Sequence, residues 1–324
     1  MASDLHSLLQ KQLLLAVETG KLTGQLKINE SMSRYTTWRI GGKAECLYRP
    51  KSTQDLQTVL KMLADETPVF WIGLGSNLLI RDGGLKGLVI NTNGVLNDYS
   101  IDCREQGDKT KCIINAQCGM ACAIFSRKAA NEGINGAEFL SGIPGTIGGA
   151  LAMNAGAFGG ETWCYVESVE MISHKGEITT RSPDEFNIAY RHIRPKEETG
   201  PEWFLSGKFC FEKDEQGLAQ SKLEIKRLLA RRAETQPTKQ ANAGSVFKNP
   251  DNDYAARLIE SCGLKGETIN DAQVSEKHAN FIINKGHALA SDVETLIKKI
   301  QKTVLEKCQV ELETEVRIIG KHRI

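Results

Sequence analysis

The apolar positions of this chain recur with both helical and strand-like spacing, which predicts a mixed α and β fold. The clearest helical pattern follows Ser52, a residue suited to cap a helix N-terminus. The clearest strand is the apolar run at 69–72, which ends at a glycine. Helices are predicted at 4–18, 52–66, 213–234, 254–262 and 291–307. Strands are predicted at 69–72, 88–90, 166–173, 204–212, 279–284 and 310–319, and strand and helix signals continue through 112–116 and 120–131.

Charge and composition exclude several classes of protein. The 41 Lys and Arg residues nearly cancel the 40 Asp and Glu residues, and a net charge of +1 gives no global field for nucleic acid or an anionic membrane. No apolar run reaches the roughly 20 residues of a membrane span. The N-terminus lacks the basic segment and cleavage site of a secretory signal. We therefore expect a cytoplasmic protein without nucleic-acid or membrane partners.

Glycine and cysteine usage narrow the chemistry. The chain has 30 Gly and only 8 Pro, so the question is whether the glycines cluster where backbone approaches a ligand. The nine cysteines are an odd number without a CxxC pair, and we interpret them as small buried apolar residues in a reducing compartment. No cysteine or histidine has metal-ligand spacing to another, so no metal site is predicted.

Two glycine clusters are candidates for binding a phosphorylated ligand. Residues 73–77, Gly-Leu-Gly-Ser-Asn, follow the predicted strand and offer backbone N–H and side-chain donors for a diphosphate. The cluster lacks the third glycine of a dinucleotide fingerprint and the Gly-Lys-Ser/Thr of a Walker A loop, so a plain turn stays open. Eight glycines within 136–160 predict either close approach to a large ligand or a set of hairpin turns.

Three further positions carry polar chemistry, each with a plain alternative. Arg191 suits bidentate capture of a carboxylate, but a surface arginine is the simpler interpretation. Ser245 lies in a small-residue turn without a base placed by sequence, so a turn or cap role is open. The alternation at 313–317 places Glu313, Glu315 and Arg317 on one strand face, which a solvated surface also explains.

Six motifs taken in order resemble those of the UDP-N-acetylenolpyruvoylglucosamine reductases, also called UDP-N-acetylmuramate dehydrogenases, of bacterial cell-wall synthesis. They are YTTWRIGG (35–42), GLGSNLLI (73–80), GAEFLSGIPGTIGGALAMNAGAFGGE (136–161), YR (190–191), NAGSVFKNP (242–250) and ETEVRIIG (313–320). The resemblance covers nearly everything from Tyr35 to Gly320.

The resemblance implies an α+β fold with a FAD-binding domain of the vanillyl-alcohol-oxidase (PCMH) type and a C-terminal α+β substrate-binding domain. The implied boundaries are an N-terminal helical arm at 1–33, the FAD-binding domain at 34–213 with subdomains of about 34–95 and 96–213, and the substrate-binding domain at 214–324. Non-covalent FAD would be contacted by Gly73, Gly75, Ser76, Asn77, Gly142, Ile143, Pro144, Gly145, Thr146, Gly149, Asn154 and Gly156.

The implied reaction is reduction of UDP-N-acetylglucosamine enolpyruvate to UDP-N-acetylmuramate through FAD, with NADPH as co-substrate. Arg191 would clamp the substrate carboxylate, and Glu315 would donate a hydrogen bond beside it in its protonated form. Ser245 would protonate the α-carbon, because an enolate-like carbon is a base strong enough to take a proton from an alcohol. The implied substrate-binding residues are Tyr190, Asn249, His278 and Asn280.

Some points stay open at this stage. One branch of the family closes a tyrosine-bearing loop over the substrate, but only three residues separate Pro250 from Tyr254 here, so the chain resembles the branch without that loop. Another flavin oxidoreductase of the same fold and a non-catalytic flavin-binding module are the alternative functions. The oligomeric state is open, with a monomer expected.

Overall fold

The computed structural model describes residues 2–107, 109–213 and 217–323, and its mixed helix and strand content agrees with the prediction. The chain divides into two compact units that each combine separate stretches of sequence. Unit 1 is Met1–Lys27, Cys46–Leu74 and Gly87–Arg231, and unit 2 is Ile28–Glu45, Gly75–Lys86 and Arg232–Ile324. The predicted domains 34–213 and 214–324 are contiguous in sequence and stay predictions; residues 214–216 at their boundary lie outside the described residues.

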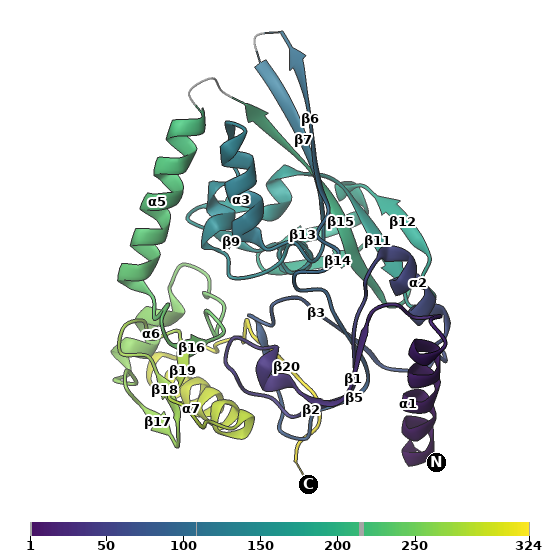
Figure 1. Cartoon of the computed structure of the whole chain (residues 1–324). Coiled ribbons are helices and arrows are strands. Elements are labelled where there is room, and N and C mark those ends of the chain that lie inside the picture. The colour runs from purple at the N-terminus through teal and green to yellow at the C-terminus, as the bar shows by residue number, and fades with distance from the viewer. Residues whose placement is uncertain (1, 108, 214–216, 324) are drawn as a thin grey trace. The chain divides into compact units, whose positions relative to one another are not determined.

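A six-stranded sheet of order β12-β11-β15-β7-β6, in which β8 also pairs with β15, is the centre of unit 1 (Figure 1). Its strands are β6 (Tyr99–Gln106), β7 (Lys109–Gln117), β8 (Ile134–Asn135), β11 (Val166–Ser173), β12 (Ile178–Arg181) and β15 (Glu202–Lys213). Helix α3 (Cys122–Asn131) packs on this sheet, and the ring centroids of Phe125 and Phe209 lie 5.2 Å apart. The predicted strand at 166–173 is confirmed as β11.

In the first part of the chain, one predicted helix start is confirmed, and the predicted helical arm at 1–33 is only partly helical. In α2 (Thr53–Lys61) the Ser52 hydroxyl accepts a hydrogen bond from the Asp55 N–H at 3.1 Å, which confirms the predicted cap. Helix α1 (Ala2–Glu18) is also confirmed, but the arm is not helical to residue 33, because β1 (Gln25–Ser31) follows it. No residue of this strand is fully buried, so the strand lacks the strongly apolar face by which a strand is predicted from sequence.

The strand β3 (Val69–Ile72) pairs in parallel with β5 (Leu85–Asn91), and the sheet that contains them has the order β1-β2-β5-β3. The remaining elements up to residue 195 are short. They are η1 (Met32–Arg34), β2 (Lys43–Arg49), β4 (Leu78–Ile80), η2 (Glu138–Gly142), α4 (Ile147–Met153), β9 (Gly156–Ala157), β10 (Gly160–Glu161), η3 (Thr162–Tyr165), η4 (Pro183–Glu185), β13 (Phe186–Ala189) and β14 (His192–Pro195).

Unit 2 contains a four-stranded sheet of order β16-β19-β18-β17 and the helices α6 (Ala255–Ser261) and α7 (Ala290–Cys308). The strands are β16 (Ala241–Asn242), β17 (Thr268–Ile269), β18 (Ala272–Val274) and β19 (Ile282–Asn284). Trp38 is fully buried in this unit, where its indole N–H donates to the Ile282 carbonyl at 2.7 Å. Strand β20 (Arg317–Ile319) pairs in parallel with β4.

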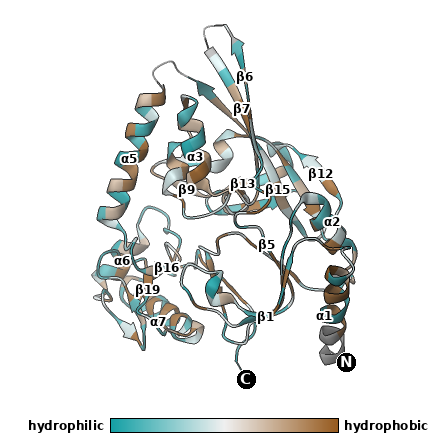
Figure 2. Ribbon diagram, viewed as in Figure 1, coloured by the Kyte–Doolittle hydropathy of each residue, from teal (hydrophilic) through white to brown (hydrophobic). Residues whose placement is uncertain are grey.

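The long helices are amphipathic. Brown and teal residues alternate along α5 (Gly217–Thr235) in Figure 2, and its buried positions Ser221, Ile225 and Leu228 recur at helical spacing. Helix α7 likewise buries Val293, Leu296 and Ile300. Among the described residues, no helix combines the length and apolar content that a membrane-spanning segment needs.

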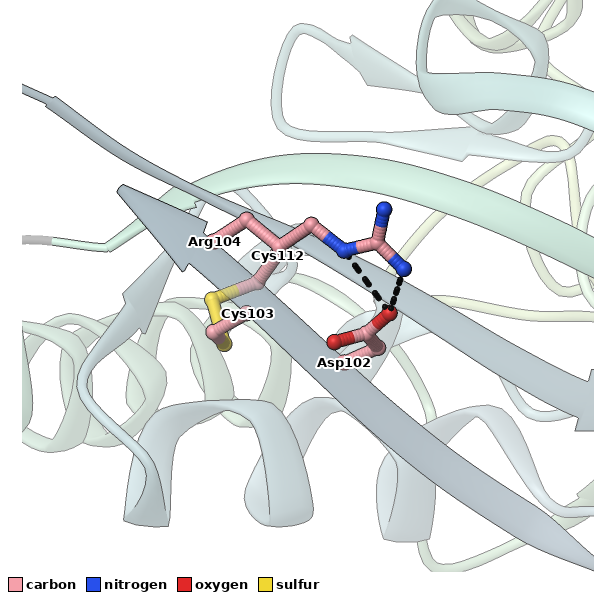
Figure 3. The surroundings of a disulfide bond; sticks show 4 residues. All are labelled: Asp102, Cys103, Arg104 and Cys112. Carbon is pink, nitrogen blue, oxygen red and sulfur yellow. Dashed lines mark hydrogen bonds and ion pairs between the residues drawn. A yellow bond between two sulfur atoms is a disulfide. The ribbon is translucent and has the colours of Figure 1, made fainter. Parts of the chain in front are cut away.

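A disulfide between Cys103 and Cys112 links β6 to β7, so the interpretation of all nine cysteines as reduced apolar residues is wrong (Figure 3). The two residues lie directly opposite each other in the antiparallel pair, with 4.0 Å between their Cα atoms. The sequence could not show this pairing, because it depends on the register of a hairpin. The interpretation does hold for Cys118 and Cys122, which are buried and free, and burial raises the pKa of each thiol to about 12.

We expect reduction of this disulfide to lower the thermal unfolding midpoint. The bond closes a sequence separation of 9 residues, for which loop entropy gives a stabilisation of roughly 2–3 kcal/mol. The measurement is thermal unfolding with and without a reductant. The control is Cys103→Ser, an exposed position, which should unfold at the same lower midpoint under both conditions. A midpoint of the unchanged chain that ignores the reductant would contradict this expectation.

Candidate active site

The loop after β3 has main-chain N–H groups for which the described part of the chain offers no acceptor. No main-chain N–H group of residues 73–77 donates a hydrogen bond to another of the described residues. Gly75 has a φ of +70°, and a Cβ there would overlap the Tyr35 carbonyl oxygen, so only glycine fits. Successive N–H groups in a turn with a left-handed residue form concavities that bind anions. The donor set of this loop therefore fits a phosphate or diphosphate.

The second glycine-rich motif reaches the first one through Gly73, within unit 1. A Cβ on Gly73 would overlap the hydroxyl oxygen of Thr146, so the two residues are immediate neighbours. Thr146 is also the N-cap of α4, where its hydroxyl accepts from the Gly149 N–H at 3.4 Å. The structure thus brings together two of the predicted FAD-contacting motifs that lie far apart in sequence.

Part of the second motif is occupied by its own packing. The Ile143 N–H donates to the Leu140 carbonyl and the Gly145 N–H to the Ile143 carbonyl, which closes a tight turn around Pro144. A Cβ on Gly142 would overlap the Phe158 ring, which gives that glycine a packing role. By contrast, the hydroxyl of Ser141 is buried and has no partner among the described residues. An orphaned hydroxyl beside the motif fits a polar ligand, as a flavin dinucleotide would be.

Arg191 lies at the tip of a β-hairpin with a two-residue turn. Ala189 of β13 pairs with His192 of β14, so Tyr190 and Arg191 form the turn. Arg191 has a φ of 54°, an uncommon conformation for a non-glycine residue and one that concentrates at functional sites. Its guanidinium carbon lies 4.8 Å from the centre of the Tyr190 ring, so the aromatic face partly covers the cation.

Asn154 and Gly156 position Arg191. The guanidinium donates to the Asn154 carbonyl at 3.3 Å and to the Gly156 carbonyl at 3.0 Å. The Asn154 side chain is 1% exposed and donates in turn to Glu161 and to the Ala189 carbonyl beside the turn. These contacts hold the plane of the guanidinium. The FAD contacts predicted for Asn154 and Gly156 stay predictions.

In unit 2, Ser245 begins a segment that runs antiparallel to the residues before Glu315. The Glu315 N–H donates to the Val246 carbonyl at 2.8 Å, and the Lys248 N–H donates to the Glu313 carbonyl at 2.9 Å. Ser245 itself is half-buried, and its hydroxyl has no hydrogen-bond partner among the described residues. The structure therefore brings the predicted proton donor and the predicted acid into one paired segment.

Asn77 joins the same group in unit 2. Its amide donates to the Glu315 carbonyl at 3.1 Å, and its own carbonyl accepts from the Arg317 N–H at 3.0 Å. The end of the first glycine motif is thus tied to the C-terminal motif. The alternation predicted for 313–317 is visible in burial, since Leu312 and Val316 are buried and Glu313 is exposed.

The other predicted substrate-binding residues of unit 2 have internal partners. The Asn249 side chain accepts at 3.1 Å from the N–H of Ala255, the first residue of α6. The His278 ring accepts from the Asn280 N–H at 3.3 Å, and its burial, with Lys265 nearby, lowers its pKa. Asn280 is 3% exposed, and its side chain faces Phe247. Substrate contact by these three residues stays a prediction.

Thr37 is a candidate that sequence reasoning did not single out. Its N–H donates to the Gly75 carbonyl at 3.3 Å, which places the first motif against the glycine loop within unit 2. Its hydroxyl oxygen is buried and has no partner among the described residues. The only signal was its place in YTTWRIGG, because nothing local distinguishes this threonine from Thr36.

Comparison with known proteins gives a consistent result. Residues 236–319 match the family model of the UDP-N-acetylenolpyruvoylglucosamine reductase C-terminal domain, and residues 44–182 match the model of a FAD binding domain. The chain is 47% identical over 313 residues to UDP-N-acetylenolpyruvoylglucosamine reductase of Coxiella burnetii (strain Dugway 5J108-111), which covers 93% of this chain and 98% of that protein.

A second relative and a solved structure agree. The chain is 50% identical over 299 residues to UDP-N-acetylenolpyruvoylglucosamine reductase of Legionella pneumophila (strain Corby), covering 92% of this chain and 93% of that protein. The crystal structure of UDP-N-acetylenolpyruvylglucosamine reductase from Thermus caldophilus superimposes with a TM-score of 0.71 at 30% identity, covering 92% of this chain and all of that one.

We expect Gly75→Ala to abolish retention of FAD, whereas Gly94→Ala should keep it. Both glycines have a left-handed φ, which costs a non-glycine residue about 1–2 kcal/mol. Only at Gly75 would the added methyl also overlap backbone, since nothing lies within 4 Å of a Cβ at Gly94. The measurement is flavin absorbance of each purified variant after gel filtration, beside its thermal midpoint. Equal flavin content in the two variants would contradict the role assigned to the loop.

Proposed function

This chain belongs to the UDP-N-acetylenolpyruvoylglucosamine reductase family, and we propose that it reduces UDP-N-acetylglucosamine enolpyruvate to UDP-N-acetylmuramate with NADPH. The reaction is a step in the synthesis of peptidoglycan precursors. The observation that carries the proposal is the paired segment that joins Ser245 to Glu315 beside Asn77. We further propose that it works as a cytoplasmic monomer, which stays a prediction.

FAD is the cofactor, and when bound it would supply the hydride-transfer chemistry between NADPH and the β-carbon of the enolpyruvyl group. The residues that would hold it are the loop 73–77, whose main-chain N–H groups have no acceptor among the described residues, and Thr146 with its neighbours in the second motif. Within unit 1, the hydroxyl of Ser141 in the second motif has no partner among the described residues and would add a donor. The chain has almost no net charge, so these local donors must meet the anionic dinucleotide.

Arg191 would bind the substrate carboxylate. Addition of hydride to the β-carbon moves the double-bond electrons toward the α-carbon and the carboxylate, so negative charge grows there during the reaction. A guanidinium can contact both carboxylate oxygens and is stabilising in proportion to that charge. The carbonyls of Asn154 and Gly156 fix its orientation before substrate arrives, which reduces the reorganisation needed in the transition state.

Ser245 would complete the reaction. Its hydroxyl gives its proton to the α-carbon, so the O–H bond breaks as the new C–H bond forms, and the serine regains a proton from solvent. The hydroxyl is suited to this because no described residue takes its hydrogen bond. Glu315 would donate a hydrogen bond to the substrate carboxylate in its protonated form. These roles rest on the match to the family motifs and on the pairing described above.

We expect Ser245→Ala to separate the two halves of the reaction. NADPH should still bleach the bound flavin at the rate of the unchanged chain, because that half needs no proton donor. Product formation should slow on the order of 10²-fold or more, the usual contribution of a positioned acid. The measurement is stopped-flow flavin absorbance in each half-reaction. The control is Ser261→Ala, an exposed serine whose hydroxyl donates to the Leu258 carbonyl one turn earlier in α6. Near-normal product formation in Ser245→Ala would exclude this serine as the acid.

We expect Arg191→Lys to lower kcat/KM strongly, by about 10²-fold, because one ammonium cannot keep two carbonyl contacts and a two-pronged contact to the carboxylate. The measurement is steady-state turnover of the enolpyruvyl substrate. Arg194→Lys, an exposed arginine in β14 of the same hairpin, is the matched control and should be near normal. If Arg191→Lys also turned over normally, the arginine would not be part of the machinery.

A further inference from the structure

Asn280 makes an unusual pair of hydrogen bonds with the backbone of Phe247. Its amide oxygen accepts from the Phe247 N–H at 2.9 Å, and its amide nitrogen donates to the Phe247 carbonyl at 2.8 Å. In addition, the main-chain carbonyl of Asn280 accepts from the Val246 N–H at 2.9 Å. The side chain therefore acts as a substitute for a neighbouring strand and pairs with both polar groups of one residue.

The segment that Asn280 holds is the one that carries Ser245. On its other edge, the Val246 carbonyl accepts from the N–H groups of Glu315 and Val316, and the Lys248 N–H donates to Glu313. Residues 246–248 are thus bonded on both sides, with Asn280 on one edge and the Glu315 segment on the other. The Phe247 side chain, 1% exposed, lies in the hydrophobic core of unit 2 and anchors the segment a third way.

We propose that Asn280 is a positioning residue that sets the place of Ser245 relative to Glu315. The proposal rests on the proposed function, and it replaces direct substrate contact as the role of Asn280. A side chain that is 3% exposed and turned toward Phe247 is poorly placed to meet a substrate. It is well placed to fix the segment on which the proton donor begins.

The chemistry of the side chain explains why an asparagine is needed. The pairing requires one donor and one acceptor in one plane, at the reach of a single methylene, and the asparagine amide supplies both at any pH. An ionised aspartate keeps the acceptor but turns a second oxygen toward the Phe247 carbonyl. The buried N–H and carbonyl of Phe247 cannot stay unpaired without cost, so the segment would shift to find other partners. A displacement of about 1 Å at a reacting group can cost on the order of 10²-fold in rate.

The first test is Asn280→Asp in the FAD-loaded chain. Reduction of the flavin by NADPH should match the unchanged chain, whereas transfer to the enolpyruvyl substrate should slow by about 10- to 100-fold. The dissociation constant of the substrate should change by less than about threefold, because the residue does not touch it. The control is Asn284→Asp, a nearby asparagine whose amide bonds the Trp38 carbonyl instead, and it should react near normally. A normal transfer rate in Asn280→Asp, or a weakened substrate affinity with a normal rate, would overturn the proposal.

The pH dependence of Asn280→Asp separates positioning from general damage. The introduced carboxyl is buried, so its pKa is raised. When protonated, it can donate to the Phe247 carbonyl and accept from the Phe247 N–H, which restores both hydrogen bonds. The transfer rate relative to the unchanged chain should therefore rise as pH falls. A ratio that is constant or falls with pH would contradict the proposed pairing. If Asn280→Asp fails to retain FAD, Asn280→Ser takes its place. This variant removes the amide without adding a charge, and its transfer rate and substrate affinity are compared with those of the unchanged chain.

A double-mutant cycle with Ser245→Ala identifies the residue through which Asn280 acts. In the Ser245→Ala background, Asn280→Asp should cost little further rate, since there is no longer a donor to position. Additive losses would mean that Asn280 acts elsewhere and would overturn the inference. Turnover by the unchanged chain distinguishes failure of the proposed function from failure of the role proposed for Asn280. If that chain fails to turn over the enolpyruvyl substrate, the proposed function is wrong, whereas normal turnover with additive losses rejects only the role of Asn280.

Discussion

The two-sided backbone pairing of residues 246–248 is the constraint on which the candidate active site of unit 2 depends. One edge is bonded to the segment that ends at Glu315, and the other edge is bonded to Asn280. Buried N–H and carbonyl groups must find partners, and a regular sheet would supply them from a neighbouring strand. Here an amide side chain supplies them instead, which leaves Ser245 at the free end of a rigid segment. The proposed proton donor is therefore a serine hydroxyl whose position is fixed by the doubly bonded segment that follows it.

Binding of the cofactor would likewise depend on a few placed hydrogen-bond donors. A chain with a net charge of +1 has no general attraction for a dinucleotide, so recognition must come from placed groups. The loop 73–77 offers backbone N–H groups, and Gly73 and Gly75 are required because a methyl at either position would overlap Thr146 or Tyr35. Arg191 is the residue proposed to bind the substrate carboxylate, and its guanidinium donates to the carbonyls of Asn154 and Gly156. The glycine-rich loops and the near-zero net charge therefore both favour recognition of an anionic ligand by placed groups, not by an overall field.

The sequence predicted features that depend on local pattern and missed those that depend on register. The cap at Ser52, the strand β11 and the helix α7 were predictable, because capping and periodicity act over a few residues. The six motifs predicted the family and its FAD-binding fold. The disulfide of Cys103 was not predictable, since it requires the exact partner across a hairpin. The pairing of Asn280 with Phe247 was also not predictable, because it joins residues that lie 33 positions apart in sequence.

The C-terminal segment was predicted only in part, again because its pairing partner is not visible in the sequence. A strand was predicted over 310–319, but only Arg317–Ile319 is one, because the residues before it pair with the short segment 246–248 and not with a sheet. The alternation of burial that suggested a strand is nevertheless real and serves this local pairing.

The most direct measurement follows nicotinamide absorbance while the FAD-loaded chain is mixed with NADPH, before and after addition of UDP-N-acetylglucosamine enolpyruvate. We predict that sustained loss of NADPH begins only when the enolpyruvyl ether is added, and that UDP-N-acetylmuramate accumulates in equal amount. Steady oxidation of NADPH that ignores the ether and consumes oxygen, or no oxidation in its presence, would contradict the proposed reaction.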